Sequence, residues 1–352
     1  MRGLHAAADG PRLRIGMNGD IPLAQPIPPQ ARGAGFPPRK AAPTVDFDAP
    51  DISRYAKGYG GLPYVLHLES KRPGPHVMVV AATHGNETCG VVALDRLIRD
   101  GIRPIHGSLS FCFANHAAYE RFDPCNPVLS RFVDEDLNRV WASPALNGPR
   151  TSLELQRARE LRPLVDTVDL LLDIHSMQSA NEALVLAGPL AKGRTLAGAV
   201  GTPIQVVSDH GHASGTRLRD YGAFADPQSP RNALLVECGQ HWQTSSVDVA
   251  LETTVHFLLH CGTVATDAVR AYLRPQPPRQ QFIEVTEAVT VRRHFRFART
   301  VTSMEVVPQA GTLLGHNDGE PVLTPYDNCV LIMPSLRGYP GQTAVRLGRH
   351  IN

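Results

Sequence analysis

Short apolar runs alternate with helical patterns through the middle of the chain. Nearly continuous apolar residues bounded by turn signals predict buried strands, and we expect them at 76–82, 109–114, 170–174 and 233–236. Apolar residues at helical spacing predict helices at 87–99, 151–165 and 247–260. Strands of this kind separated by helices favour an α/β fold with a mostly parallel or mixed sheet covered by helices on both faces.

Two of the predicted helices begin at recognisable start signals. Asn86 is a candidate N-cap for the first helix, because a side-chain oxygen at that position satisfies a free backbone N–H. Thr151 and Glu154 have the spacing of a capping box at the start of the second.

The pattern changes near both ends of the chain. Residues 1–50 are rich in Pro, Gly, Ala and Arg and lack apolar periodicity, so we expect them to be disordered or an extended arm. Residues 51–272 carry the α/β pattern and would form the main domain. The Pro-rich segment 273–281 is typical of a linker. Residues 282–352 predict a smaller β-rich domain with strands at 285–291, 300–307, 330–333 and 343–347.

Composition excludes several function classes. The chain has 352 residues, of which 42% are hydrophobic, and a formal net charge of +2. It has no clustered basic face for nucleic acid, no apolar stretch long enough to cross a membrane and no apolar core of a secretory signal. Six cysteines form no CxxC pair and are typical of buried free thiols in a reducing cytoplasm: Cys89, Cys112, Cys125, Cys238, Cys261 and Cys329. We therefore expect a cytoplasmic protein that binds neither nucleic acid nor membranes.

Polar residues stand at or just beyond the ends of the predicted strands. They are His84, Asn115, His175 and Glu237. The carboxyl ends of parallel strands meet at one edge of a sheet, where ligands bind in open α/β folds. This shared placement predicts a site at that edge.

The segments around His84, His175 and Glu237 contain residue types that bind metals or transfer protons. His84 and Glu87 stand three positions apart across a strand-to-helix turn, and imidazole and carboxylate both bind zinc, although a turn histidine that caps a helix gives the same pattern. Asp173 and His175 share a strand face, which fits either a ligand with its orienting carboxylate or a hydrogen-bonded core histidine. Glu237 is costly to bury at a strand end unless it moves a proton or forms an ion pair.

The segment 131–139 places two arginines and an asparagine around three acidic residues. Arginine forks suit the recognition of a carboxylate, and the acids would orient those forks. A solvated loop with internal ion pairs fits the same residues.

Taken together, four motifs resemble the aspartoacylase and succinylglutamate desuccinylase family, which is related to the zinc carboxypeptidases. They are HGNE at 84–87, DLNR at 136–139, DIHS at 173–176 and VECG at 236–239, in the family's order. The resemblance implies a zinc carboxypeptidase-like catalytic domain, and the β-rich tail fits the family's smaller second domain.

The resemblance also implies roles for individual residues. One zinc ion per chain would be held by His84, Glu87 and His175. Glu237 would be the general base and acid, and Arg131 would polarise the scissile carbonyl.

Substrate binding is implied for three further residues. Asn138 and Arg139 would bind the substrate carboxylate, and Tyr339 is the nearest match to a tyrosine that the family contributes from its C-terminal domain. Asp136 would support them. A second cation for an acidic substrate is sought among Arg217, Arg219 and Arg231.

The function that follows is zinc-dependent hydrolysis of the amide bond of a small N-acyl amino acid. The alternatives are a zinc carboxypeptidase acting on short peptides and a non-catalytic relative that binds metal or an amino acid. The sequence leaves open whether the protein forms a homo-oligomer. Two further features each have two interpretations: the loop 209–212 is either a lid or a flexible polar loop, and His241 lies either in the cleft or on the surface.

Overall fold

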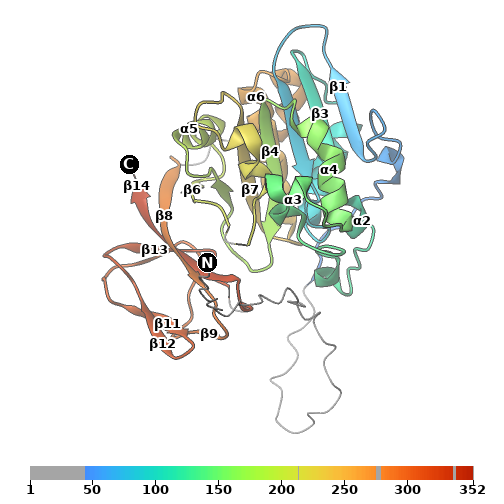
Figure 1. Ribbon diagram of the computed structural model, residues 1–352. Helices are drawn as coiled ribbons and strands as arrows, with labels where there is room; N and C mark the ends of the chain where they lie inside the picture. Colours follow the sequence, from blue (N-terminus) through green and yellow to red (C-terminus); the bar gives the residue numbers. More distant parts are fainter. Residues whose placement is uncertain (1–43, 213, 275–278, 336–337, 352) are drawn as a thin grey trace, which may run out of the picture. The chain divides into compact units, whose positions relative to one another are not determined.

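The computed structural model describes residues 44–212, 214–274, 279–335 and 338–351 (Figure 1). Most of the predicted N-terminal arm (1–50) and the centre of the predicted linker (273–281) therefore lie outside the described residues. The domain boundaries stay predictions.

Strands of the described chain form one large mixed sheet and one small sheet. The strands are β1 (Val65–Glu69), β2 (His76–Ala81), β3 (Ser108–Phe113), β4 (Leu170–Met177), β5 (Leu184–Leu186), β6 (Gln205–Ser208), β7 (Asn232–Gln240), β8 (Gln281–Thr290), β9 (Phe295–Phe297), β10 (Glu305–Val307), β11 (Leu313–Asn317), β12 (Glu320–Leu323), β13 (Cys329–Ile332) and β14 (Thr343–Ile351). The 11-stranded sheet has the order β1-β3-β2-β4-β7-β5-β6-β8-β14-β13-β10, and β12-β11-β9 form the 3-stranded sheet.

The centre of the large sheet is parallel. β3, β2, β4 and β7 run in the same direction, so their carboxyl ends lie at one edge. β1 and β5 are antiparallel to their neighbours β3 and β7. The C-terminal strands β8, β14, β13 and β10 extend the sheet in antiparallel pairs, and the small antiparallel sheet follows from the same segment. The predicted mixed α/β fold with a smaller β-rich part is confirmed.

Helices cover both faces of the parallel centre (Figure 1). The α-helices are α1 (Thr88–Arg99), α2 (His116–Tyr119), α3 (Ser143–Asn147), α4 (Leu153–Val165), α5 (Ala191–Val200), α6 (Thr244–His260) and α7 (Thr266–Val269). In β2, Val77 and Val79 pack into the apolar cluster with α1, α5 and α6, whereas Met78 and Val80 pack into the cluster with α4. Because strand side chains alternate between faces, this two-sided burial explains why the strand is continuously apolar. No helix in the described ranges has the length and apolarity needed to span a membrane.

Several local predictions from the sequence were wrong. Within the predicted strand at 300–307, only the residues of β10 form a strand. The short strands β5 and β6 and helix α5 were not predicted. Cys125 is exposed, because it lies in a loop rather than in a strand, and Cys261 is half-buried; the other four cysteines are buried. Glu87 rather than Asn86 precedes the first residue of α1, and no side chain caps that helix.

The predicted capping box at the start of α4 was also wrong. Ser152, not Thr151, is the N-cap, and its hydroxyl accepts a hydrogen bond of 3.0 Å from the N–H of Leu155. The carboxylate of Glu154 bonds the loop 133–135 instead of the backbone of its own helix. Its fully buried carboxylate accepts the backbone N–H groups of Val133 at 2.6 Å, Asp134 at 3.0 Å and Glu135 at 3.2 Å. Helix α4 thereby fixes the segment 131–139, which carries four of the residues expected in the site.

We expect Glu154→Ala to destabilise the protein strongly, because three part-buried backbone N–H groups and the buried side-chain amide of Asn115 would lose their acceptor. Each unsatisfied buried donor costs about 1–3 kcal/mol, so a loss of roughly 3–5 kcal/mol in the free energy of unfolding is expected, measured by urea denaturation. The control is Glu160→Ala on the exposed side of the same helix, with an expected change below about 1 kcal/mol. Equal effects of the two substitutions would contradict the anchoring role.

Candidate active site

The HGNE turn connects the end of β2 to the start of α1 and brings a loop from elsewhere against it. A Cβ on Gly85 would lie 2.4 Å from the carbonyl oxygen of Ser130 and 2.3 Å from the carbonyl carbon of Ala118, so only glycine allows this approach. The Gly85 N–H donates to the carbonyl of Arg131 at 3.1 Å. The glycine therefore places Arg131 beside the turn.

His84, Glu87 and His175 converge at the carboxyl edge of the sheet. The Nδ1 atom of His84 lies 2.7 Å from Oε1 of Glu87, and the Nδ1 atom of His175 lies 2.9 Å from Oε2. One ligand atom from each residue falls within 4.8 Å of the others, and all three residues are buried. Two imidazoles and one carboxylate at this spacing are a donor set that fits a divalent metal ion, zinc in particular.

A second carboxylate lies beside the Nε2 atom of each imidazole, on the side of the ring opposite Glu87. Nε2 of His84 lies 2.8 Å from Oδ1 of Asp136, and Nε2 of His175 lies 2.8 Å from Oδ2 of Asp173. Asp173 in turn accepts the hydroxyl of Thr83 at 2.9 Å. Asp136 forms a hydrogen bond with the His84 ring, whereas Oδ2 of Asp173 lies at ion-pair distance from the His175 ring and has no hydrogen-bond partner among the described residues. A carboxylate beside the far nitrogen of each ring is the usual arrangement at metal-binding histidines.

The charges at this position are strongly coupled. Burial alone would raise the pKa of Glu87, but the imidazoles of His84 and His175 outweigh burial and hold that pKa well below its ordinary value. Burial would likewise lower the pKa of His175, but Asp173 and Glu87 raise it well above the ordinary value. The protein therefore stabilises the carboxylate form of Glu87.

Glu237 lies beside this cluster on the neighbouring strand. It is the register partner of His175 between β4 and β7, and its carboxylate is buried. Its Oε2 atom has no hydrogen-bond partner among the described residues. Burial, with the nearby charge of Glu87, raises the pKa of Glu237 to about 8. A carboxyl group with a pKa near neutrality is suited to accepting and returning a proton.

Arg131 lies directly against the candidate metal ligands. Its guanidinium is 3.3 Å from Oε1 of Glu87 and 3.1 Å from Oδ2 of Asp136, and a third of the side chain is exposed. A cation in this position faces both the ligand cluster and the open cleft.

The other residues expected to bind substrate line the same cleft. Asn138 is buried, and its Oδ1 atom accepts the N–H of Leu218 at 2.8 Å. Arg139 donates from Nη1 to the carbonyl of Asn138 at 2.7 Å. Tyr339 lies at the rim and is 69% exposed, on the segment between β13 and β14. The cleft has a volume of about 900 Å³ and combines residues from the α/β part and the C-terminal strands.

The three arginines considered as a second cation for the substrate lie in different surroundings. Arg217 lines the cleft, but its guanidinium is bound by Asp209 and Asp220. Arg219 is buried against backbone carbonyls, and Arg231 bonds the carbonyl of Asp166 away from the cleft lining.

His241 had two interpretations in the sequence, of which the cleft position is confirmed, and Arg346 had none. His241 is buried and lines the cleft, with Nδ1 at 2.8 Å from the hydroxyl of Ser176, so the surface interpretation was wrong. Arg346 of β14 also lines the cleft and was not predicted. Its one available signal was a charged residue inside the otherwise apolar run 344–347.

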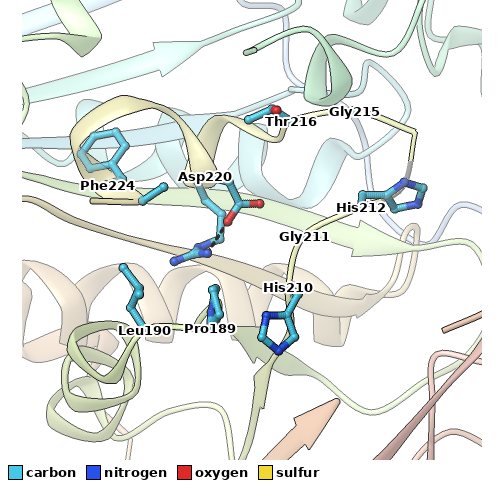
Figure 2. A pocket seen from close by; sticks show the side chains of 11 residues that line it. Pro189, Leu190, His210, Gly211, His212, Gly215, Thr216, Asp220 and Phe224 are labelled. Carbon is cyan, nitrogen blue, oxygen red and sulfur yellow. Dashed lines mark hydrogen bonds and ion pairs between the residues drawn. The ribbon is translucent and has the colours of Figure 1, made fainter. Parts of the chain in front are cut away.

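A second cavity of about 340 Å³ is lined in part by His210, Gly211 and His212. Figure 2 shows His210 beside Pro189 and Leu190 in this cavity, whereas His212 lies further along the loop. His212 lines both this cavity and the cleft.

The comparison with protein families decides which family this is. Residues 73–261, more than half of the chain, match the model of the succinylglutamate desuccinylase/aspartoacylase catalytic domain. The chain belongs to this family. The matched region contains the HGNE, DLNR, DIHS and VECG motifs and every site residue described above except Tyr339 and Arg346.

Family members with curated names align over part of their length. The chain is 33% identical over 138 residues to a probable aspartoacylase from Parasynechococcus marenigrum (strain WH8102), which is 36% of this chain and 44% of that protein. It is 30% identical over 116 residues to an N-acyl-aromatic-L-amino acid amidohydrolase (carboxylate-forming) from Xenopus laevis, or 30% of this chain and 36% of that protein. The alignments thus span less than half of either relative.

Solved structures of the family share the fold over most of the chain. A succinylglutamate desuccinylase from Vibrio parahaemolyticus superposes with a TM-score of 0.61 at 18% identity, covering 82% of this chain and 87% of that one. Murine aminoacylase 3 gives a TM-score of 0.55 at 19% identity, covering 80% and 97%. These matches extend beyond the catalytic domain and show the fold.

We expect the wild-type protein to take up about one zinc ion per chain and His175→Ala to take up far less, because the substitution removes one of three donors. Elemental analysis after dialysis against zinc and then buffer measures this. The matched control is His210→Ala, which lies in the second cavity and should keep the wild-type content. A His175→Ala protein that retains a full equivalent of zinc would contradict the assigned ligand set.

Proposed function

We propose that this protein is a zinc-dependent amidohydrolase that removes the acyl group from a small N-acyl amino acid. The observation that carries the proposal is the buried His84–Glu87–His175 cluster beside the unpaired carboxylate of Glu237. Together these features would hold a metal ion and a proton acceptor side by side in an open cleft.

The relatives support the same class of reaction. One is named a probable aspartoacylase and another an N-acyl-aromatic-L-amino acid amidohydrolase, and both names describe cleavage of an amide between an acyl group and an amino acid. Because the two names imply different side chains, they support the reaction class and leave the amino acid to be found by experiment.

The donor set fits zinc on the chemistry of its atoms. Two Nδ1 atoms and a carboxylate form the set, and each imidazole has its other nitrogen beside a carboxylate. When bound at such a site, zinc acts as a Lewis acid and lowers the pKa of water.

Glu237 is the residue that moves the proton. Its unpaired Oε2 atom takes a proton from the attacking water and then delivers it to the leaving nitrogen, which becomes the free amine of the amino acid. Its raised pKa of about 8 suits both steps near neutral pH. The products are a carboxylic acid and an amino acid.

The arginines orient the substrate and stabilise charge. Arg131, held by Glu87 and Asp136, presents N–H donors where negative charge develops on the scissile carbonyl oxygen. Arg139 and Asn138 line the cleft beside it and bind the α-carboxylate. Tyr339, an exposed residue in the lining of the same cleft, would contact a bound substrate.

We expect Glu237→Gln to lower kcat by about 10²- to 10⁴-fold while zinc content stays near wild type, since an amide cannot accept the proton. The assay measures release of free amine from a panel of N-acetyl and N-succinyl amino acids, with dipeptides included to test the carboxypeptidase alternative. Glu252→Gln on α6, which is absent from the cleft lining, is the control and should keep full activity.

Two outcomes contradict the proposal. A Glu237→Gln protein with wild-type kcat would remove Glu237 from the mechanism. Zinc-loaded wild type that cleaves dipeptides but no N-acyl amino acid would replace deacylation with peptidase activity.

A further inference from the structure

His241 is a buried histidine in the cleft lining that the proposed mechanism does not use. The residue is only 2% exposed, and its ring lies against the indole of Trp242, with 5.1 Å between the ring centroids. Trp242 in turn donates from Nε1 to the carbonyl of Asn86 at 3.1 Å. Because Asn86 belongs to the HGNE turn, these contacts hold the imidazole of His241 beside the candidate metal ligands.

A bulge at the end of β7 brings His241 to this place. Between His175 and Met177 of β4 the chain advances two residues, whereas the paired segment of β7 advances three. Gly239 within the bulge has a φ of +102°, which glycine adopts without strain. After the bulge, the N–H of His241 donates to the carbonyl of Met177 at 2.9 Å. Bulges of this kind redirect side chains next to functional sites.

The surroundings keep the imidazole of His241 neutral. Burial lowers its pKa to about 4; the charge of Glu87 opposes this effect, and the charges of Arg131, His84 and His175 add to it. Near neutral pH the ring therefore carries a single N–H and can donate one hydrogen bond there.

The Ser176 hydroxyl determines which ring nitrogen carries that proton. Its Oγ atom lies 2.8 Å from Nδ1 of His241. Nδ1 is the stronger acceptor beside this hydroxyl, since the sulfur of Cys89, its other neighbour, accepts only weakly. The hydroxyl therefore donates to Nδ1, and the ring proton is on Nε2. Among the described residues Nε2 has no hydrogen-bond partner, so its N–H is left for a ligand in the cleft.

His241 and Arg131 approach the candidate metal ligands at different oxygens of Glu87. Arg131 lies 3.3 Å from Oε1. The backbone N–H of Ser176, whose side chain bonds His241, donates to Oε2 at 3.1 Å. Both Arg131 and His241 line the cleft. The cleft therefore has two donors of different kinds near the cluster, a guanidinium and a neutral imidazole.

We propose that His241 is a further catalytic residue, which donates a hydrogen bond from Nε2 to the oxygen of the scissile carbonyl. This inference rests on the proposed amide hydrolysis. Negative charge grows on that oxygen as water adds to the carbonyl carbon, so the hydrogen bond strengthens toward the transition state. No bond to His241 forms or breaks, and its proton stays on Nε2. Arg131 and His241 then stabilise the same oxygen.

The test uses two amide side chains that place an N–H at different points of the ring. The nitrogen of Gln in His241→Gln can take the position of Nε2, whereas that of Asn in His241→Asn can take the position of Nδ1. We expect His241→Asn to lower kcat by about 10²-fold and to keep KM within about threefold of wild type, because the donor acts mainly in the transition state. His241→Gln should keep kcat within about 10-fold of wild type.

Further variants separate catalysis from support of the fold. His241→Met is similar in length but has no donor, so it should match His241→Asn and replaces it if that variant does not fold. His260→Asn, at the exposed end of α6, is the matched control and should keep the wild-type kcat. Urea denaturation and zinc content of each variant measure the fold independently of turnover. Equal kcat values for folded His241→Gln and His241→Asn overturn the inference.

Phosphonamidates give a readout that needs no turnover, because a tetrahedral phosphorus replaces the scissile carbon. Calorimetric titration of the zinc-loaded protein with N-methylphosphonyl aspartate and N-methylphosphonyl phenylalanine measures their affinity. His241→Asn should weaken the binding of the analogue that wild type prefers by about 10²-fold and leave the affinity for the free amino acid within about threefold. Equal losses for analogue and amino acid would assign His241 to the fold and overturn the inference.

The same assays distinguish this inference from the proposed function. If wild type cleaves dipeptides but no N-acyl amino acid, and His241→Gln still exceeds His241→Asn, only the deacylase proposal fails. If wild type cleaves N-acyl amino acids and the two variants have equal kcat, only the inference about His241 fails.

Discussion

The carboxylate of Glu87 lies buried between two imidazole rings, and the geometry of the site depends on keeping it there. A buried carboxylate is stable only when its charge is matched, and here the matching groups are His84 and His175, from two different strand ends. Asp136 forms a hydrogen bond with the far nitrogen of His84, and Asp173 lies at ion-pair distance from the far nitrogen of His175. The result is a set of three donors that the surrounding side chains hold close together.

The fold supplies this arrangement in two ways. Parallel β2, β4 and β7 deliver the HGNE turn, His175 and Glu237 to one edge of the sheet. The loop that carries Arg131 and Asp136 has no regular structure of its own and is held from outside, by Gly85 on one side and by Glu154 on the other. The sheet thus positions the candidate metal ligands, and hydrogen bonds to backbone groups position the loop that carries Arg131 and Asp136.

The cluster of His84, Glu87 and His175, the strands that carry it and the fold class could be predicted from the sequence, because apolar strand runs and short ordered motifs are local signals. Glu154 was assigned to a capping box, since its spacing from Thr151 is local, whereas its actual partners lie about 20 positions away along the chain. Arg346 gave no motif at all. Its position in the cleft depends on the pairing of β14 with β8 and β13, which no local pattern specifies.

The roles of His84, Glu87 and His175 as one metal site are the central claim, and diffraction at the zinc absorption edge tests it most directly. Crystals grown with zinc should show one strong anomalous peak, about 2.0–2.2 Å from Nδ1 of His84, from Nδ1 of His175 and from the Glu87 carboxylate. A peak bound instead through other residues, or none in a folded protein saturated with zinc, would contradict the account.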